Sequence, residues 1–313
     1  MNAPDLTTAV GELTLAGPVM AASGCGGTGR ELEPFTDLSS LGALVTRSVT
    51  LDARAGTRPP RAVETPSGLV VDTGLQGPGL QGFLATELPW LAQRKVRTVV
   101  SIAGENLGEW AELARRVALS PGVAAVEVNL SWPPGSTASR DSFAAEKIVA
   151  AVRRDIPRGV VLLAKVAADP HTVVDVSRAV LKAGAEAVVV GHGPAALALD
   201  PGTLRPVLGG DAGRLGGPAV NPVALRCVWD LHEALPDVPL VGGGGVRSGL
   251  DALVMLAAGA SAVQVGSALL HDPGAVRRIT EELSAQLEQR GIARVADLVG
   301  SAHRSTSETG DTP

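Results

Sequence analysis

Short apolar segments recur along the whole chain and alternate with longer segments in which apolar residues repeat every three or four positions. The short segments are 18–23, 43–49, 98–103, 125–131, 160–166, 187–192, 239–245 and 262–270. Helical periodicity is clearest in 109–119, 144–156, 175–185 and 275–291. Strands that are apolar on both faces and alternate with amphipathic helices are typical of a parallel sheet covered by helices. Eight such strands predict an α/β protein with a single (β/α)8 (TIM) barrel over residues 1–300.

Two connections are too long to be simple turns between a strand and a helix. They are residues 50–82 and 194–217, and both follow predicted strands. In a barrel of this kind such connections lie at the carboxyl ends of the strands, so we expect two loop insertions at the C-terminal mouth. The last residues, 301–313, are polar and rich in Ser and Thr, which predicts a flexible tail.

Composition and charge exclude several classes of function. The 313 residues carry a net charge of −5 and include four Trp, three Phe and no Tyr, so neither a basic surface nor a base-stacking platform for nucleic acid is expected. No apolar run reaches the ~18 residues of a membrane span, and Met1–Val10 lacks the basic start of a signal peptide. The two cysteines, Cys25 and Cys227, have no metal-ligand spacing. We therefore expect a cytoplasmic protein with reduced thiols, no metal and no membrane or nucleic-acid partner.

Glycines after the last two predicted strands form a candidate phosphate site. Gly242–Gly245 follow the seventh strand, and Gly266 with Ser267 follows the eighth. Backbone N–H groups at such positions approach an anion closely, and these two loops are the usual phosphate site in this fold. The alternative is that the glycines only make tight turns. We interpret them as a site for a phosphorylated ligand or cofactor.

Two further residues stand out at strand ends. Lys165 is a single cation in the apolar run VLLAKVA, so it either faces the barrel mouth or extends its amine to solvent. The strand 125–131 ends in Ser131-Trp132-Pro133-Pro134, which places a bulky indole where many α/β enzymes keep a reactive side chain. That indole could form a wall of the site or simply fill the core.

Several segments together resemble the class 1 dihydroorotate dehydrogenases, and in particular the FMN-binding catalytic subunit of the NAD-linked branch. The similarity covers about residues 10–300. The segments are MAASGCGGTGRE (20–31), RPPRAVET (58–65), TGLQGPGL (73–80), ELPWL (87–91), GGPAVNPVALR (216–226) and LVGGGGVRSGLDALVMLAAGASAVQVGSALL (240–270).

The resemblance implies FMN as the cofactor and assigns its contacts. Thr46 and Asn129 match ring contacts on the second and fourth strands, and Lys165 matches the lysine at the pyrimidine edge of the flavin. A fixed cation at that edge would stabilise the anionic reduced ring. Ser101 stands where the family usually has Asn. The other matching residues are Ala22, Ser23 and Gly24 at the ring, and Gly217, Gly244, Gly245, Gly266 and Ser267 at the ribityl chain and phosphate.

On the substrate side the sequence departs from the family. Trp132 replaces the Cys that serves as the base, and an indole N–H cannot accept a proton. Arg47 replaces a lysine, Val71 an asparagine, and His192-Gly193 an Asn-Thr pair. A site built to hydrogen-bond orotate becomes a much poorer catalyst for dihydroorotate when the residues that make those hydrogen bonds are replaced. We therefore expect a divergent member that exchanges hydride between flavin N5 and a small cyclic or carboxylated substrate other than dihydroorotate.

Two alternatives to this function stay open. One is an authentic dihydroorotate dehydrogenase of pyrimidine biosynthesis that uses another base. The other is a non-catalytic FMN-binding scaffold or regulatory paralogue. Possible partners are a second copy of the chain in a homodimer and an electron-transfer subunit, because Cys25 and Cys227 cannot by themselves hold an iron–sulphur cluster.

The candidate catalytic residues are His192, Arg47 and Trp132. His192 could act as acid or base at neutral pH or be merely structural, and Arg47 could bind a carboxylate with two hydrogen bonds. Asp72 is a second possible acid or base, or holds Arg47 or a loop. The candidate substrate contacts are Asp72, Thr73, Gly74, Leu75, Ser131 and Gly193.

Overall fold

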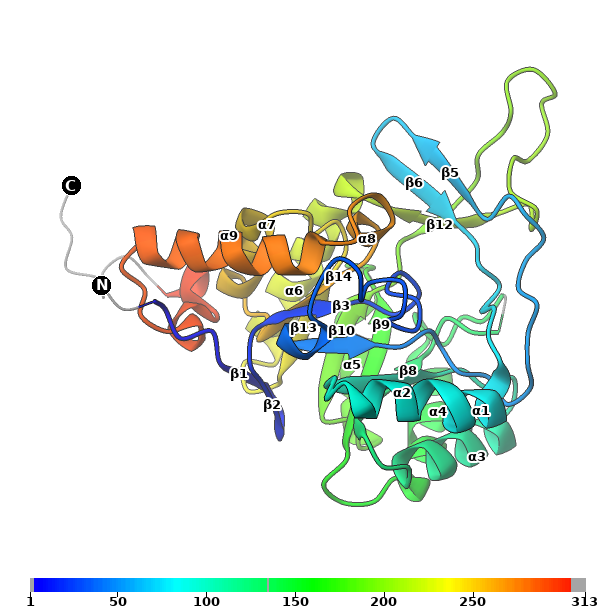
Figure 1. The fold of residues 1–313 in the computed structure, drawn as a ribbon, viewed down its shortest axis with the longest axis horizontal. Coiled ribbons are helices and arrows are strands. Elements are labelled where there is room, and N and C mark those ends of the chain that lie inside the picture. The colour runs from blue at the N-terminus through cyan, green and yellow to red at the C-terminus, as the bar shows by residue number, and fades with distance from the viewer. Residues whose placement is uncertain (1–2, 134, 305–313) are drawn as a thin grey trace.

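A closed barrel of eight parallel strands forms the centre of the protein (Figure 1). The computed structural model describes residues 3–133 and 135–304. Around the barrel the strands follow in the order β3, β4, β7, β8, β9, β10, β13 and β14, and β14 pairs with β3 again. Their bounds are Val19–Ala21, Ala43–Val45, Thr98–Ile102, Val123–Asn129, Val161–Ala167, Ala187–Gly191, Leu240–Gly243 and Ala262–Val265. The predicted TIM barrel is thereby confirmed.

The prediction for the last strand is wrong at its C-terminal end. Residues 262–270 were expected to be extended, but the strand stops at Val265, and Ala268–His271 form the short helix α8. Gly266 and Ser267 interrupt the pairing of β14 with its neighbours, and the Ala-Leu-Leu run that follows favours a helix once it has left the barrel.

Successive strand residues face opposite sides of the barrel wall, as the pleat of a strand requires. In β10, Val188 and Val190 pack in the cluster between the strands and the helices, whereas Val189 belongs to the cluster that fills the barrel interior. Both faces of the wall are therefore apolar. This explains why the strands have continuous apolar sequences instead of alternating ones.

An N-terminal hairpin, which the sequence analysis did not predict, contributes to the interior cluster. Strands β1 (Thr8–Val10) and β2 (Leu13–Leu15) pair antiparallel. Their side chains Val10, Leu13 and Leu15 are buried in the same cluster as the inward-facing barrel residues. In Figure 1 the hairpin and the long insertions lie at opposite ends of the barrel, so the hairpin closes the end away from the insertions.

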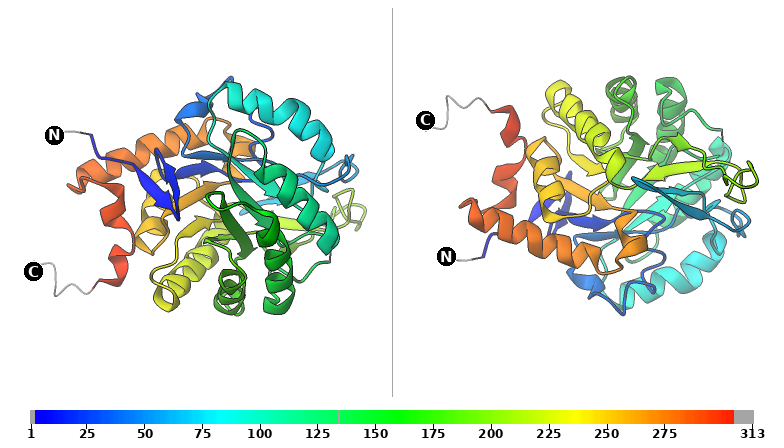
Figure 2. Two further views of the ribbon diagram at one scale, coloured as in Figure 1. Left: turned by 90° about the horizontal axis from the view of Figure 1, so that it is seen from below. Right: turned by 90° about the horizontal axis from the view of Figure 1, so that it is seen from above.

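Helices surround the barrel, as the two views in Figure 2 show. In α3, Trp110, Leu113 and Val117 recur at helical spacing and are buried against the strands. The longer helices are α3 (Leu107–Ala118), α4 (Ser142–Asp155), α5 (Val173–Lys182), α6 (Asn221–Ala234), α7 (Gly249–Ala257) and α9 (Ala275–Gln289). Shorter helical segments are α1 (Gly79–Gly82), the π-turn Phe83–Glu87, α2 (Leu88–Gln93), and 3-10 turns at Leu38–Ser40, Pro218–Val220, Val295–Leu298 and Ser301–His303.

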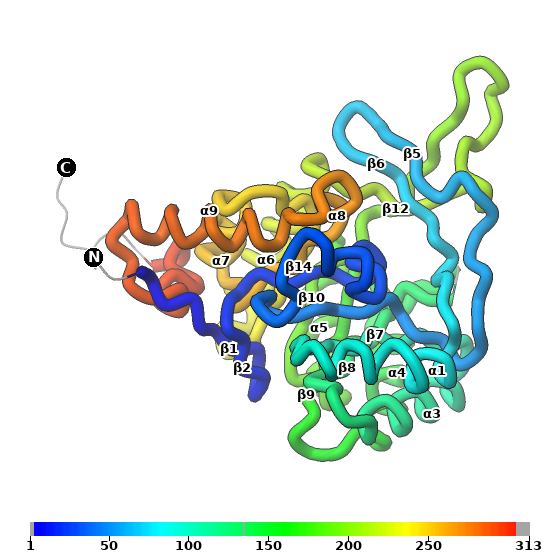
Figure 3. Tube along the Cα trace, viewed as in Figure 1, coloured from blue at the N-terminus to red at the C-terminus, as the bar shows by residue number. Residues whose placement is uncertain are grey.

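The two long insertions meet in a second, four-stranded antiparallel sheet. Its order is β11 (Ala195–Ala196), β12 (Gly213–Gly216), β6 (Gly68–Val71) and β5 (Ala62–Thr65). The insertions were predicted to lie at the barrel mouth, whereas the pairing between them was not. The tube in Figure 3 shows the β5–β6 hairpin and the connection from β11 to β12 rising beyond the barrel. This sheet brings residues from distant parts of the chain over the strand ends.

The C-terminal segment is described only as far as residue 304, and 305–313 lie outside the described residues. The His303 ring stacks on Trp229 of α6 with 3.7 Å between ring centroids. The predicted flexible tail, 301–313, therefore begins with a turn that is packed on the barrel.

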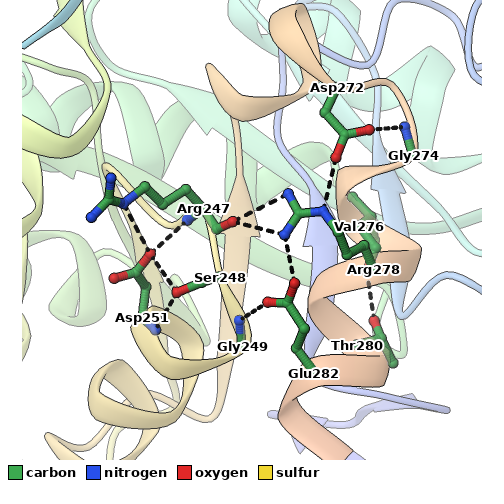
Figure 4. Close-up of polar contacts among 10 residues, drawn as sticks. All are labelled: Arg247, Ser248, Gly249, Asp251, Asp272, Gly274, Val276, Arg278, Thr280 and Glu282. Atoms are coloured by element: carbon green, nitrogen blue, oxygen red, sulfur yellow. Dashed lines mark hydrogen bonds and ion pairs between the residues drawn. The ribbon is translucent and has the colours of Figure 1, made fainter.

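A polar network fixes the start of α7, directly after the glycine-rich loop at the end of β13 (Figure 4). The Ser248 hydroxyl accepts a hydrogen bond from Asp251 N at 3.1 Å and donates to the Asp251 carboxylate at 2.9 Å. Glu282 of α9 accepts a hydrogen bond from Gly249 N at 2.7 Å and pairs with Arg278 at 2.8 Å. Two N–H groups at the start of α7 thus have acceptors: Ser248, the capping residue before the helix, binds one, and Glu282 of α9 binds the other.

The capping residue gives the first prediction. Ser248→Ala should lower the free energy of unfolding by about 1 kcal/mol, because the Asp251 N–H loses its acceptor. Urea unfolding followed by circular dichroism measures this change. Ser284→Ala in the interior of α9 is the matched control and should be neutral or slightly stabilising, since alanine favours a helix interior. Equal losses in both variants would show that the cap contributes nothing specific.

Candidate functional site

A cavity of about 650 Å³ opens at the carboxyl ends of the barrel strands, with residues of the inserted sheet in its wall. This volume lies within the range of roughly 300–1,000 Å³ that small-molecule and cofactor sites occupy. Most of the residues nominated from the sequence line it: Ala22, Ser23, Gly24, Arg47, Asp72, Thr73, Gly74, Leu75, Asn129, Ser131, Trp132, Lys165, His192, Gly193, Gly217, Gly244, Gly245, Gly266 and Ser267.

Two nominated residues, Thr46 and Ser101, are buried but do not line the cavity. Ser101 N donates to the Thr46 hydroxyl at 3.2 Å, and the Ser101 hydroxyl lies 2.9 Å from that of Ser48. Ser48 does line the cavity and was not nominated. Thr46 and Ser101 therefore support the wall from behind.

Lys165 faces the cavity from a paired position. Its Nζ donates to Oε1 of Gln264 at 2.7 Å and lies 3.6 Å from Oε1 of Glu127. Gln264 Nε2 donates to the other oxygen of the Glu127 carboxylate at 2.7 Å. Glu127 is fully buried and Lys165 is 7% exposed, and buried charges persist only with partners of this kind. Lys165 therefore contributes a fixed cation at the cavity and does not extend to bulk solvent.

A chain of hydrogen bonds connects β8 with the end of β10. Asn129 Nδ2 donates to the Ser48 hydroxyl at 2.9 Å. The Ser131 hydroxyl lies 2.9 Å from Asn129 Oδ1 and 3.1 Å from Nδ1 of His192. His192 follows β10 and adopts a left-handed backbone conformation with φ 58°. This conformation is uncommon for a residue other than glycine, and it turns the chain back at the rim of the barrel.

The donors and acceptors in this chain fix the tautomer of His192. Ser131 N can only donate, and it lies 3.2 Å from Asn129 Oδ1, which identifies that atom as the oxygen. The Ser131 hydroxyl therefore donates to the same oxygen and accepts from Nδ1–H of His192. With its proton on Nδ1, a neutral imidazole has an acceptor lone pair on Nε2. That Nε2 is buried and has no hydrogen-bond partner within residues 3–133 and 135–304.

The surroundings keep this imidazole neutral. Burial first, and then the charges of Lys165 and Arg214, hold the pKa of His192 well below its ordinary value of 6.5. His192 is thus neutral at neutral pH, oriented through one nitrogen and unpartnered at the other among the described residues. A neutral imidazole with a free lone pair is the form in which a histidine can accept a proton.

Trp132 packs into the core and also forms a wall of the cavity, so both interpretations of it from the sequence hold in part. The side chain is 6% exposed and belongs to the main apolar cluster. The Arg54 guanidinium lies 4.4 Å from the centre of the indole ring, an attractive cation–π contact. Arg54 also pairs with Glu105 at 3.0 Å. The indole Nε1 is buried and has no partner in the described part of the chain.

Arg47 and Asp72 have protein partners of their own. The Arg47 guanidinium pairs with Glu31 at 2.8 Å. Asp72 accepts from the Thr57 hydroxyl at 2.8 Å and from Gly74 N at 3.1 Å. Of the roles considered for Asp72, the structure therefore shows the one in which it holds a loop.

Cys25 lines the cavity but is not a base at neutral pH. Burial raises the pKa of its thiol to about 11, although the charge of Lys165 acts in the opposite direction. The thiol is therefore protonated and behaves as a small apolar group.

Three glycines at the candidate phosphate site are required by the backbone, whereas Gly266 has room for a Cβ. Gly217, Gly244 and Gly245 have φ values of +104°, +118° and +70°. A Cβ on Gly245 would lie 2.7 Å from Asn221 Cβ, and one on Gly244 would lie 2.9 Å from Ala224 Cβ. At Gly24 a Cβ would meet nothing within 4 Å. Bare backbone therefore borders the cavity on this side, as binding of a phosphate by N–H groups requires.

Several residues of the site were missed, among them Ser48, Glu127, Gln264, Arg54 and Arg214, all of which line the cavity. Glu127 and Gln264 interrupt apolar strands as Lys165 does, and that pattern could have identified them. Arg54 and Arg214 lie in the insertions, where the sequence offers no periodicity from which to place a side chain.

Two further properties of the described residues concern metal binding and membrane insertion. No group of three or more His, Cys, Asp and Glu side chains is arranged to hold a metal ion there. Within the same residues, no helix is both long and apolar enough to span a membrane.

Comparison with known proteins identifies close relatives. The family described as "Dihydroorotate dehydrogenase" matches residues 5–287. The protein of Desulforudis audaxviator named "Dihydroorotate dehydrogenase B (NAD(+)), catalytic subunit" is 42% identical over 300 residues, which cover 95% of this chain and 97% of the relative. A protein of the same name from Pelobacter propionicus is 41% identical over 301 residues, 95% of this chain and 98% of the relative.

A solved structure supports the fold. The crystal structure of DHODH in complex with ferulenol from Eimeria tenella matches with a TM-score of 0.79 and covers 96% of this chain and 89% of that chain. The sequence identity of 22% limits this likeness to the fold.

The neutral state of His192 gives the second prediction. The unfolded chain binds a proton near the ordinary pKa of 6.5, and the folded protein does not. Stability should therefore be fully present above about pH 6.5 and fall as the pH decreases below it. Urea midpoints at pH 7.5 and pH 5.5 should differ less in His192→Asn than in the wild type.

The matched control is His171→Asn, which changes an exposed histidine. It should leave the acid dependence as in the wild type. If His192→Asn shows the same acid dependence as the wild type, the imidazole is not held neutral by the fold.

Proposed function

Because the chain belongs to the dihydroorotate dehydrogenase family, we propose that it is an FMN-dependent enzyme that oxidises dihydroorotate, with His192 as the acid/base group. Members of this family are flavin-dependent oxidoreductases that act on a CH–CH group. The observation that carries the proposal is the neutral His192 in the cavity wall, fixed through Nδ1 and unpartnered at Nε2.

FMN fits the residues present at the cavity. Gly217, Gly244 and Gly245 offer backbone N–H groups for its phosphate, since side chains are excluded at these positions. Lys165 would lie at the pyrimidine edge of the ring and stabilise negative charge there, held in place by Gln264. When bound, FMN supplies a two-electron acceptor that takes a hydride at N5. The further contacts proposed for it are Ala22, Ser23, Gly24, Asn129, Gly266 and Ser267, and Thr46 and Ser101 would support this wall from behind.

His192 would take the proton from the carbon next to that which loses the hydride. Removal of a proton and a hydride from adjacent carbons turns a CH–CH bond into a C=C bond, so the two acceptors together balance the reaction. The Ser131 hydroxyl accepts from Nδ1–H and stabilises the imidazolium that forms. The Trp132 indole excludes water from this side of the cavity, which strengthens the electrostatic interactions inside.

The relatives favour dihydroorotate as the substrate over the different substrate expected from the sequence. Two relatives at 41–42% identity, matched over nearly their whole length, are named for dihydroorotate oxidation. Loss of the family's cysteine at Trp132 does not exclude this activity, because His192 lines the same cavity and would serve as the base.

A different small cyclic or carboxylated substrate is the second candidate. Trp132 favours it, because an indole occupies more of the cavity wall than the cysteine that it replaces. The substrate-side residues Arg47, Asp72, Thr73, Gly74, Leu75 and Gly193 border this space.

Electrons would leave through a partner subunit. The relatives are catalytic subunits of enzymes named for NAD(+). We extend this to the present chain as a proposal, together with association into a homodimer.

The third prediction tests the substrate. Mixing the oxidised holoprotein with dihydroorotate in the absence of oxygen should bleach the flavin absorption near 450 nm, roughly the usual flavin maximum, because the substrate reduces the bound cofactor. Dihydrouracil, which lacks the carboxylate, is the control and should bleach it far more slowly. Bleaching by another cyclic acid but not by dihydroorotate would instead establish the second candidate.

The fourth prediction tests the base. His192→Asn should lower the rate of flavin reduction by roughly 10²–10⁴-fold, the usual contribution of a general base. Its flavin content should equal that of the wild type, because the glycine site is unchanged. His171→Asn serves again as the control. An unaltered rate would assign the proton to another group, and lost flavin would assign His192 to cofactor binding.

A further inference from the structure

Arg214 lies at the centre of the inserted sheet and lines the cavity. In β12 it pairs with Val71 of β6 on one side and with Ala195 of β11 on the other. Its side chain is half-buried, and Nη1 donates to the Gly193 carbonyl at 3.2 Å. Because Gly193 follows His192 directly, this bond holds the guanidinium beside the proposed base.

Arg214 differs from the other cations of the cavity in having no carboxylate partner. Arg47 pairs with Glu31 at 2.8 Å, Arg54 with Glu105 at 3.0 Å, and Lys165 with Glu127 at 3.6 Å. Within residues 3–133 and 135–304, no carboxylate oxygen lies within 4.0 Å of the Arg214 guanidinium.

The hydrogen-bonding capacity of Arg214 is largely unused. A guanidinium has five N–H donors in a planar fork that matches the two oxygens of a carboxylate. One donor is used by Gly193 among the described residues, and that acceptor is an uncharged carbonyl. Burial lowers the pKa of Arg214, which reflects the cost of holding this charge away from water. An anionic ligand would offset that cost.

We propose that Arg214 binds the carboxylate of the substrate and thereby selects carboxylated rings. This inference rests on the proposed function for the place of the substrate but not on its identity as dihydroorotate. A carboxylate on the fork of Arg214 would hold the ring close to His192, because the same guanidinium binds the carbonyl of the adjacent Gly193. Arg47, nominated from the sequence for this contact, already binds Glu31.

The ligand class is a cyclic acid with its carboxylate on the ring. Two matched pairs of probes test this: orotate against uracil, and benzoate against benzamide. In each pair the second member retains the ring but has no negative charge. Binding to the oxidised holoprotein is followed by the shift of the flavin absorption, which requires no turnover.

The wild type should bind each acid more tightly than its uncharged counterpart. Arg214→Gln should weaken binding of the acids by roughly 10- to 150-fold, the range for a hydrogen bond to a charged group, and leave the uncharged probes unchanged. Arg214→Lys should lose part of this affinity, because it keeps the charge but not the fork. Arg205→Gln, an exposed arginine in the same insertion, is the matched control.

The outcomes separate this inference from the proposed substrate. If benzoate responds to Arg214→Gln and orotate does not bind at all, Arg214 is the anchor and dihydroorotate is not the substrate. If neither acid binds better than its uncharged counterpart, or if Arg47→Gln and not Arg214→Gln weakens the acids, the inference is overturned.

The same variants decide whether Arg214 serves the cofactor. A purified Arg214→Gln protein that has lost its FMN, with a circular dichroism spectrum like that of the wild type, would show that the anion on Arg214 is the cofactor phosphate. That result also overturns the inference. If Arg214→Gln does not fold, the partial loss expected for Arg214→Lys decides the question.

Discussion

Closure of eight parallel strands into one barrel is the constraint on which the rest of the structure depends. Since all the strands point the same way, every carboxyl end reaches the same rim, and residues far apart in the chain meet there. The interior must also be filled. Toward one end the hairpin residues Val10, Leu13 and Leu15 complete an apolar cluster. The buried polar side chains of the strands, Glu127, Lys165 and Gln264, lie at the other end, next to the cavity, where they bind one another.

The Glu127, Gln264 and Lys165 network shows how charge is accommodated in such an interior. The amide of Gln264 donates to the carboxylate and accepts from the amine, so three strands, β8, β9 and β14, are connected by two hydrogen bonds of 2.7 Å. The positive charges of Lys165 and Arg214 also act on His192, whose proton would add a like charge in a buried place. The fixed cations of the cavity therefore help to keep the His192 imidazole neutral.

The structure changes the interpretation of the residues that differ from the family on the substrate side of the site. The sequence suggested that a missing cysteine meant a missing base. In the structure His192 lies at the same cavity as Trp132, and its free nitrogen is unpartnered. Together with relatives named for dihydroorotate, this favours the family reaction over a changed one. Replacement of the cysteine by Trp132 does not by itself indicate a new substrate, because His192, which could also accept a proton, lines the same cavity.

The sequence by itself determined the barrel, the position of the insertions and the glycine-rich loops, because these depend on local patterns of apolar residues and on backbone conformations that only glycine adopts readily. It also nominated Lys165, Asn129 and His192. Only the tertiary structure decided the tautomer of His192, the pairing of Arg47 with Glu31, and the approach of Arg214 to Gly193. The physical reason is that such contacts join segments with no common periodicity. Their geometry is set by how the inserted sheet packs over the closed barrel.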